Sequence, residues 1–200
     1  LARAVLEDQP GATIIAEVKC SKILYDDISA NGGQAIMWKA GHSLIKSKMK
    51  ECGAALAGEM SGHIFFKHRY YGFDDAAYAG GRLLEILGNT DDTLDQLLGE
   101  IPELVSTPEL RVDCPESMKF ELVKNVTRAF QERAGEGGFK VIDIDGARVE
   151  WDDGWGLVRC SNTQPILVLR FEAQTQERLA EIQAIFNEEI RVQRNRLENE

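Results

Sequence analysis

The sequence GEMSGH at positions 58–63 carries three side chains that could bind a polar ligand. Glu59 offers a carboxylate, Ser61 a hydroxyl and His63 an imidazole, and glycines stand at 58 and 62. Apolar residues 54–57 and 64–66 flank the motif, which therefore reads as a loop between two strands. Binding residues concentrate on loops held by a rigid scaffold, and glycine lets the backbone approach a ligand closely. The alternative is a polar turn between two core strands, which these residues alone favour slightly.

A second motif, RCSNT at positions 159–163, combines a guanidinium, two hydroxyls and an amide within five residues. Arg159, Ser161, Asn162 and Thr163 supply these groups, and Arg170 follows on what we expect to be the adjacent strand. A bidentate fork and several neutral donors suit the three oxygens of a phosphate. The alternative is a hydrogen-bonded hairpin turn with a surface arginine. We favour phosphate binding, because five consecutive donor-bearing positions exceed what a turn requires.

The first half of the chain predicts alternating strands and helices. Strands are expected at residues 13–18, 34–38 and 54–58, and helices at 22–30 and 44–52, with short connections. This order predicts a mostly parallel sheet in a three-layer α/β/α domain, in which ligands bind beyond the carboxyl ends of the strands. Each of these three strand ends carries polar side chains: Lys19, then Lys39 and His42, then Glu59, Ser61 and His63.

Taken singly, these residues have simpler explanations. A lone lysine such as Lys19 is more often a surface residue, and a lone His42 or His63 is more often structural. Ser43 is most simply the cap of the helix that follows it, and Asp74 is expected to cap a helix at 75–87. The shared place of the polar residues at one sheet edge makes joint ligand binding the stronger hypothesis, without identifying the ligand.

The second half predicts a separate, smaller α+β domain. Residues 102–108 contain two prolines and no periodic pattern, which indicates a linker. After it we expect a strand at 109–113, a helix at 115–133, a loop at 135–138, strands at 139–144, 147–151, 154–160 and 166–171, and a helix from 176 to about 197. This order predicts a mainly antiparallel sheet. The two domains are placed at 1–104 and 105–200.

Asp143 and Asp145 precede Gly146 in a pattern that a metal-binding loop could share. We predict no metal site there, because the pattern offers only two carboxylates. Asp-Gly between two strands is in addition a strong hairpin signal, which already explains the choice of residues.

Composition narrows the class of protein. The chain has 200 residues, of which 44% are hydrophobic and 28% charged, as in a soluble globular protein. A net charge of −10 argues against nucleic-acid binding, although cations gathered in one cleft could still bind a small anion. No apolar run is long enough to span a membrane. The four cysteines are widely spaced, which argues against a cysteine zinc site or a redox dithiol and favours a reducing cytoplasm.

Four groups of residues together resemble the α-D-phosphohexomutases, most closely the bacterial phosphomannomutase/phosphoglucomutase branch. They are VKCS at 18–21, WKAGHS at 38–43, GEMSGH at 58–63, and RCSNTQP at 159–165 with LRFEA at 169–173. The motifs stand in the family's order over nearly the whole chain, and GEMSGH combined with RCSNT is highly specific. The enzymes of this family have four domains around a central cleft, and the chain resembles the third and fourth.

The resemblance implies reversible phosphoryl transfer between the 1- and 6-positions of a hexose phosphate, through a bisphosphorylated sugar that reorients. It implies that Glu59 and Ser61 bind sugar hydroxyls and that Lys19 and His42 contact the substrate. His63 matches a position near the transferring group, with a role in proton transfer. The phosphate that is not reacting is then held by the second motif: Arg159, Ser161, Asn162 and Thr163, with Arg170 bracing the loop.

Two features of the family are absent from this sequence: a phosphorylated serine in an SHNP context and a magnesium loop of the type DGDGDR. The chain also begins at Leu1 instead of Met. We therefore expect a fragment that lacks the N-terminal domains, binds phosphosugar weakly and does not catalyse. Mg²⁺ and an activator of the glucose 1,6-bisphosphate type then belong to the whole enzyme.

Three alternatives stay open. The chain could be a non-catalytic phosphosugar-binding module, a scaffold or oligomerisation fragment without a ligand, or part of a phosphoglucosamine-type mutase. The motif GEMSGH favours the glucose/mannose branch, because the glucosamine-type relatives usually vary this loop. Neither a nucleic acid nor a membrane is expected as a partner.

Overall fold

The computed structural model describes residues 1–99 and 101–199, with the side chain of residue 136 also left out. The contacts divide the chain into two compact units, Leu1–Pro102 and Glu103–Glu200. Among the described residues, no helix is both long enough and apolar enough to cross a lipid bilayer.

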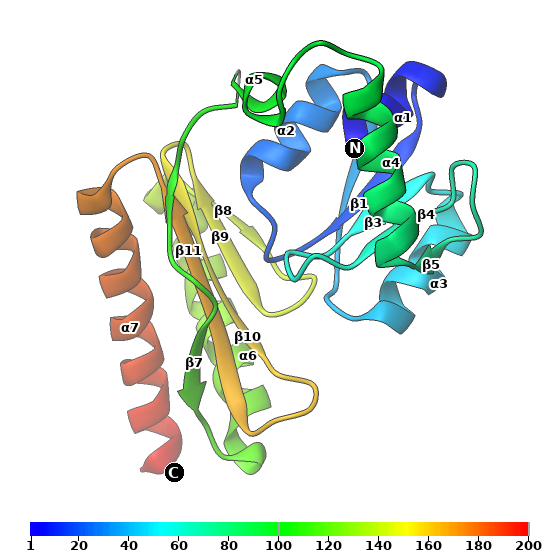
Figure 1. Cartoon of the computed structure of the whole chain (residues 1–200). Coiled ribbons are helices and arrows are strands. Elements are labelled where there is room, and N and C mark those ends of the chain that lie inside the picture. The colour runs from blue at the N-terminus through cyan, green and yellow to red at the C-terminus, as the bar shows by residue number, and fades with distance from the viewer. Residues whose placement is uncertain (100, 200) are drawn as a thin grey trace. The chain divides into compact units, whose positions relative to one another are not determined.

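The first unit is built on a five-stranded sheet in the order β2-β1-β3-β4-β5 (Figure 1). The pairs of β1 with β2 and with β3 are parallel, whereas β3 with β4 and β4 with β5 are antiparallel. The predicted α/β sheet is thus confirmed, with a mixed strand order. The elements are α1 (Ala2–Asp8), β1 (Thr13–Glu17), α2 (Lys22–Ala30), β2 (Gln34–Trp38), α3 (His42–Cys52), β3 (Leu56–Gly58), β4 (Ile64–Phe66), β5 (Phe73–Asp74), α4 (Ala76–Gly88) and α5 (Leu94–Leu98).

Helices cover both faces of this sheet, which gives the predicted three layers. Successive strand residues point to opposite faces, so each strand contributes to two cores. One core joins α1, α2 and α4 to Ile14 and Phe66 of the sheet. The other core joins α3 to Ile15 and Phe65. Because β1, β2 and β3 are parallel neighbours, their carboxyl ends meet at one edge of the sheet.

Two helix caps differ from the sequence expectation. Ser43 does not cap α3, because the helix already begins at His42 and has Gly41 as its N-cap at a φ of 129°. Glycine adopts this positive φ readily, so the helix can begin directly after Gly41. Its first residue, His42, then precedes Ser43. Asp74 does not cap α4 either; Asp75 does so, and Asp74 ends β5 instead. Asp74 is thus free of the capping role and lies beside His42 and His63.

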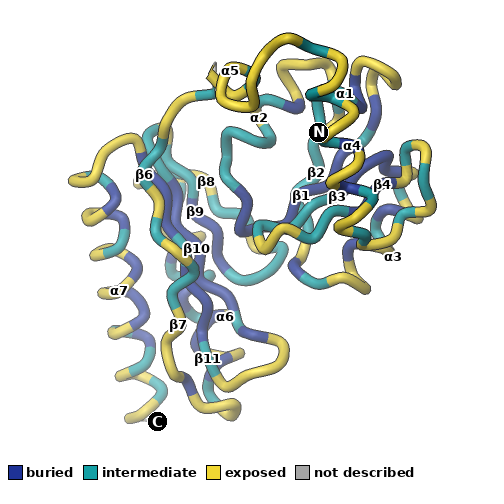
Figure 2. The backbone as a smooth tube through the Cα atoms, viewed as in Figure 1, coloured by how far each residue is buried: buried dark blue, intermediate teal, exposed yellow. Residues whose placement is uncertain are grey.

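The second unit is an antiparallel sheet in the order β6-β11-β10-β9-β8, with β7 also paired to β11. Helices α6 and α7 pack on one face, where Leu122, Phe130 and Phe186 meet Val158 and Leu169 of the strands. Figure 2 shows α7 buried on the side toward the strands and exposed on the other. The elements are β6 (Val105–Ser106), β7 (Leu110–Asp113), α6 (Glu116–Gly137), β8 (Lys140–Ile142), β9 (Ala147–Trp151), β10 (Gly154–Cys160), β11 (Ile166–Ala173) and α7 (Gln176–Glu198).

Two segments predicted as irregular are partly regular. Residues 102–108 were expected to be a linker, yet Val105 and Ser106 form β6 and pair with the end of β11. This pairing satisfies backbone groups that the edge of β11 would otherwise leave open. The loop expected at 135–138 is also shorter, because α6 continues to Gly137 and ends at Gly138 in the left-handed conformation.

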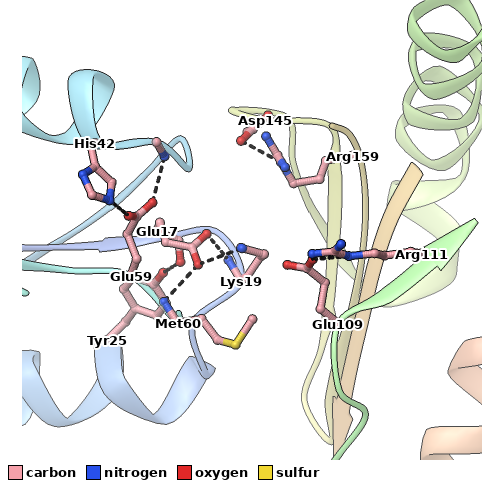
Figure 3. Close-up of polar contacts among 11 residues, drawn as sticks. Glu17, Lys19, Tyr25, His42, Glu59, Met60, Glu109, Arg111, Asp145 and Arg159 are labelled. Atoms are coloured by element: carbon pink, nitrogen blue, oxygen red, sulfur yellow. Dashed lines mark hydrogen bonds and ion pairs between the residues drawn. The ribbon is translucent and has the colours of Figure 1, made fainter. Parts of the chain in front are cut away.

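A buried carboxylate ties β1 to the loop that follows β3. Glu17 is fully buried at the end of β1, and its Oε1 accepts the N–H of Met60 at 3.1 Å. Its Oε2 accepts the N–H of Lys19 at 3.0 Å, and the Lys19 Nζ lies 3.8 Å from Oε1 (Figure 3). Burial raises the pKa of Glu17, and the charge of Lys19 with the two N–H donors opposes that rise. The carboxylate is thus a fixed part of the scaffold.

Replacing Gly146 with alanine is expected to destabilise the second unit more than a matched change at Gly138. Gly146 turns the hairpin between β8 and β9 at a φ of 84°, and an added Cβ would lie 2.2 Å from the carbonyl oxygen of Val158. Gly138 has a φ of 62°, and its Cβ would meet no atom within 4 Å. We expect Gly146→Ala to lower the free energy of unfolding by about 3 kcal/mol and Gly138→Ala by about 1 kcal/mol. Urea denaturation of both variants measures the difference; equal losses would contradict the steric argument.

Glu17→Gln is expected to change how stability depends on pH. A carboxyl whose pKa is raised by folding binds its proton more tightly in the folded state. Its contribution to stability is therefore fully present below the ordinary glutamate pKa and is lost as the pH rises through the raised pKa. The wild type should lose stability relative to Glu17→Gln across that interval.

Urea denaturation at a series of pH values checks this, and Glu188→Gln serves as a control of opposite sign. The hydrogen bond from Arg191 lowers the pKa of Glu188. The wild type should therefore gain stability relative to Glu188→Gln as the pH rises. The interpretation of Glu17 fails if the stability difference between wild type and Glu17→Gln does not change with pH. It fails also if that difference changes in the same direction as the difference between wild type and Glu188→Gln.

Candidate functional site

Glu59 is held in place at the start of α3. Its Oε1 accepts the backbone N–H of Gly41 at 2.9 Å, and its Oε2 lies 3.4 Å from His42 Nε2. The side chain of Glu59 is only 7% exposed. The free N–H groups at a helix N-terminus favour a negative charge, so the sequence places this carboxylate where α3 stabilises it. Figure 3 shows Glu59 directed at His42 from the neighbouring loop.

The two histidines of the predicted site lie against each other. The ring centroids of His42 and His63 are 4.3 Å apart, and the planes meet at 69°. His63 Nδ1 lies 2.8 Å from Oδ2 of Asp74, and His42 Nδ1 lies 3.8 Å from the same oxygen. A carboxylate can only accept, so the neutral His63 ring carries its proton on Nδ1 and leaves Nε2 as an acceptor. Asp74 therefore orients His63, a role that the sequence did not reveal.

The remaining predicted residues of the first unit differ in exposure. Lys19 is 9% exposed and stands beside Glu17 at the end of β1. Lys39 and Ser61 are exposed on the loops after β2 and β3. The structure thus brings His42, Glu59 and His63 into contact and leaves Lys39 and Ser61 at the surface of the same edge. Glu17, which sequence reasoning missed, could have been noticed as a single charge in an apolar strand.

The second predicted site is the turn between β10 and β11. Ser161 is buried, and its Oγ accepts the N–H of Thr163 at 3.3 Å and of Gln164 at 3.2 Å. These two donors therefore act within the turn. The residues Asn162 and Thr163 of the same turn are exposed. The hydrogen-bonded hairpin turn is thus present, and phosphate binding by this turn stays a prediction.

Arg159 precedes the turn on β10 and is paired with Asp145. Its Nε donates to Asp145 Oδ2 at 2.9 Å, and the residue is 5% exposed (Figure 3). Asp145 sits in the hairpin between β8 and β9, where sequence reasoning treated it as a turn residue alone. The ion pair fixes one edge of the guanidinium and so sets its direction.

Lys119 of α6 supports the turn and was not predicted. It is 1% exposed, and its Nζ donates to the carbonyl oxygens of Ser161 at 2.8 Å and Gln164 at 3.0 Å. Glu116 lies 2.7 Å from the same nitrogen. A buried ammonium requires such acceptors, and these hold the turn to the helix. The signal was present, since Lys119 falls on the apolar face of the helix, three positions before the fully buried Leu122.

Arg170 lies on β11 opposite Leu157 of β10, and it alternates with the core residues Leu169 and Phe171. It therefore points to the face of the sheet away from α6 and α7. Its Nε is buried and has no hydrogen-bond partner among the described residues. The support that Arg170 is expected to give the turn stays a prediction.

Two family models match the chain: "Phosphoglucomutase/phosphomannomutase, alpha/beta/alpha domain III" over residues 1–105, and the C-terminal domain of the same family over residues 109–189. The phosphomannomutase/phosphoglucomutase of Pseudomonas syringae pv. tomato is 50% identical over 187 residues, which cover 94% of this chain and 39% of that protein. A phosphoglucomutase of Neisseria meningitidis serogroup A is 52% identical over 185 residues, covering 92% and 40%.

A crystal structure of a phosphoglucomutase/phosphomannomutase family protein from Burkholderia thailandensis agrees with the fold at a TM-score of 0.84 and 47% identity. The match covers 96% of this chain and 40% of that one. The chain therefore spans about 40% of the length of these relatives. Both domain matches and the identity across the two units agree: the chain belongs to the phosphoglucomutase/phosphomannomutase family, of which it comprises the third and the C-terminal domains.

Proposed function

We propose that this chain is the sugar- and phosphate-binding part of a cytoplasmic mutase. The mutase moves a phosphoryl group between the 1- and 6-positions of glucose or mannose through a bisphosphorylated sugar. One observation carries the proposal: Glu59, His42 and His63 meet at the carboxyl edge of a parallel sheet, in a chain about half identical to phosphoglucomutases and phosphomannomutases. In this proposal residues 1–104 bind the sugar and residues 105–200 bind the phosphate.

Glu59 is suited to accepting hydrogen bonds from sugar hydroxyls. A carboxylate only accepts hydrogen bonds, and its two oxygens can take more than the single N–H of Gly41. Sugar hydroxyls are donors that meet this demand in either orientation of the sugar. Ser61, Lys19 and Lys39 add a hydroxyl and two ammonium groups along the same edge. Because the Glu59 carboxylate is already held in place, little conformational entropy is lost when the ligand binds.

His63 is suited to moving a proton near the transferring group. Asp74 holds its Nδ1 at 2.8 Å, so Nε2 is the atom that can accept a proton from a hydroxyl. Orientation of an imidazole by a carboxylate is the usual way in which such a base is fixed. His42 packs against this ring and contacts the substrate in the proposal.

The turn after β10 is suited to holding the phosphate that is not reacting. Asp145 accepts from Arg159 Nε, and in this proposal the terminal nitrogens of the guanidinium bind the phosphate. Asn162, Thr163 and Ser161 would add neutral hydrogen-bond donors to the phosphate. Arg170 is a second arginine on the neighbouring strand β11. In this proposal it braces the turn and does not contact the phosphate.

The residues of this chain do not fit the magnesium ion that the family reaction uses. Mg²⁺ requires octahedral oxygen ligands, whereas the one cluster of suitable residues among the described positions offers two imidazoles and a single carboxylate. We therefore assign Mg²⁺, the phosphoserine and the bisphosphate activator to the part of the enzyme that precedes this chain. Phosphoryl transfer depends on positioning and charge neutralisation, and this chain supplies the positioning.

A non-catalytic phosphosugar-binding module is the second candidate, and it describes the 200 residues taken alone. A scaffold fragment without a ligand is the third, and it predicts no phosphosugar binding. A phosphoglucosamine-type parent is disfavoured by the GEMSGH motif at 58–63.

Arg159→Ala is expected to weaken binding of glucose 1-phosphate by about 10- to 100-fold, since a hydrogen-bonded charge contributes about 1.5–3 kcal/mol. Arg111→Ala is the matched control, because Arg111 is an exposed arginine of β7 paired with Glu109. Isothermal titration of the chain with glucose 1-phosphate measures both variants. Equal affinity of Arg159→Ala and wild type would remove Arg159 from the phosphate site, and absence of any binding by wild type would favour the scaffold alternative.

The purified chain is expected to show no mutase turnover, because its sequence contains neither the SHNP serine motif nor the DGDGDR magnesium loop of the family. A coupled assay of glucose 6-phosphate formation from glucose 1-phosphate, with Mg²⁺ and glucose 1,6-bisphosphate present, checks this. A Glu59→Gln variant shows whether any trace activity belongs to the chain. Turnover that disappears in this variant would contradict the proposed division of labour.

A further inference from the structure

His42, Glu59 and His63 form a compact group of metal-ligating atoms. One ligand atom from each of the three lies within 4.8 Å of the other two. Tetrahedral zinc with bonds of about 2.0–2.1 Å needs donors roughly 3.4 Å apart. The spacing of Glu59 Oε2 from His42 Nε2 is already 3.4 Å. The His63 nitrogen of this group lies within 4.8 Å of the ligand atoms of His42 and Glu59 and would have to move closer to complete the set.

The surroundings of the group resemble the outer shell of a metal site. Metal-binding histidines typically give their second ring N–H to a carboxylate, which fixes the ring and leaves the other nitrogen for the metal. Asp74 holds His63 in this way, at 2.8 Å from Nδ1. Gly41 N–H holds Oε1 of Glu59 and leaves Oε2 toward His42. Both ligands are thus oriented by groups outside the cluster.

The group is also accessible and has the right composition for a transition metal. The side chains of His42 and His63 are 43% and 45% exposed, so an ion can enter from solvent. Two imidazoles and one carboxylate are a ligand set that zinc accepts, with a fourth position open to water or a ligand. Burial raises the pKa of the Cys160 thiol to about 11, which keeps this thiol protonated and a weak competitor for the ion.

We propose that His42, Glu59 and His63 bind Zn²⁺ or a similar divalent transition metal, and that Asp74 orients the site. A second part of the proposal rests on the proposed function: the ion and the phosphosugar cannot bind at the same time, because Glu59 cannot give the same lone pairs to both. Zinc would then act as an inhibitor at the sugar edge, separate from the magnesium of the reaction.

The first test uses Co²⁺ as a spectroscopic substitute for Zn²⁺ on the full chain. Bound Co²⁺ should give the intense visible bands of a four- or five-coordinate site, without the near-ultraviolet band of a thiolate ligand. Zn²⁺ should displace it. Octahedral, water-like spectra or a thiolate band would overturn the proposed ligands.

The second test uses substitutions at exposed or partly exposed positions. His42→Ala and His63→Ala should each weaken Co²⁺ and Zn²⁺ binding by more than tenfold, and Asp74→Asn by about 10- to 100-fold through loss of orientation. His68→Gln is the control, because the chain has three histidines and His68 is the one outside the group. Circular dichroism verifies folding of every variant. Unchanged affinity in a folded His42→Ala/His63→Ala double variant would overturn the site.

The third test separates the metal site from the proposed function. Glucose 1-phosphate should raise the apparent dissociation constant of Zn²⁺ more than inorganic phosphate at the same concentration, which controls for binding of zinc by phosphate itself. Glucose 1-phosphate that binds the chain without displacing Zn²⁺ would overturn mutual exclusion and leave the metal site standing. If glucose 1-phosphate does not bind at all, the proposed function fails, while the first two tests still decide the metal site.

Discussion

The buried carboxylate of Glu17 accepts hydrogen bonds from Lys19 and Met60, and the arrangement of the polar edge follows from these two bonds. Met60 lies in the loop that carries Glu59, Ser61 and His63, so the end of β1 fixes where that loop begins. A buried charge of this kind is costly unless its partners are in place. The bond from Met60 therefore ties this loop to the end of β1.

Lys119 has the corresponding role in the second unit. Its buried ammonium binds two carbonyl oxygens of the turn after β10, as Glu17 binds two N–H groups in the first unit. In both places the buried charge contacts backbone groups of a neighbouring loop or turn. Glu17 and Lys119 are buried, whereas Ser61, Asn162 and Thr163 on the loop and the turn that they hold are exposed.

Local sequence patterns were enough to predict the helices and strands, but they did not predict the side-chain contacts between these elements. The expected bounds at 22–30, 34–38 and 154–160 coincide with α2, β2 and β10, because apolar periodicity and turn residues act over a few positions. The bond of Glu17 to Met60 spans 43 positions and that of Lys119 to Ser161 spans 42, so neither has a local signature. Asp145 was explained by its turn, which concealed its bond to Arg159. Asp74 was predicted to cap α4, but Asp75 caps that helix.

The polar edge of the first unit balances opposite charges. Glu59 and Asp74 attract a cation toward His42 and His63, whereas Lys39 attracts an anion from the adjacent loop. Lys19 is largely compensated by Glu17, which lies 3.8 Å from its ammonium. The sugar of the proposed ligand suits both signs, because a hydroxyl can donate to a carboxylate and can accept from an ammonium group. A metal ion satisfies only the carboxylates and imidazoles, so Lys39 opposes it weakly through solvent. In the two proposals this edge binds either the sugar or a metal ion, and Glu59 can serve only one of them at a time.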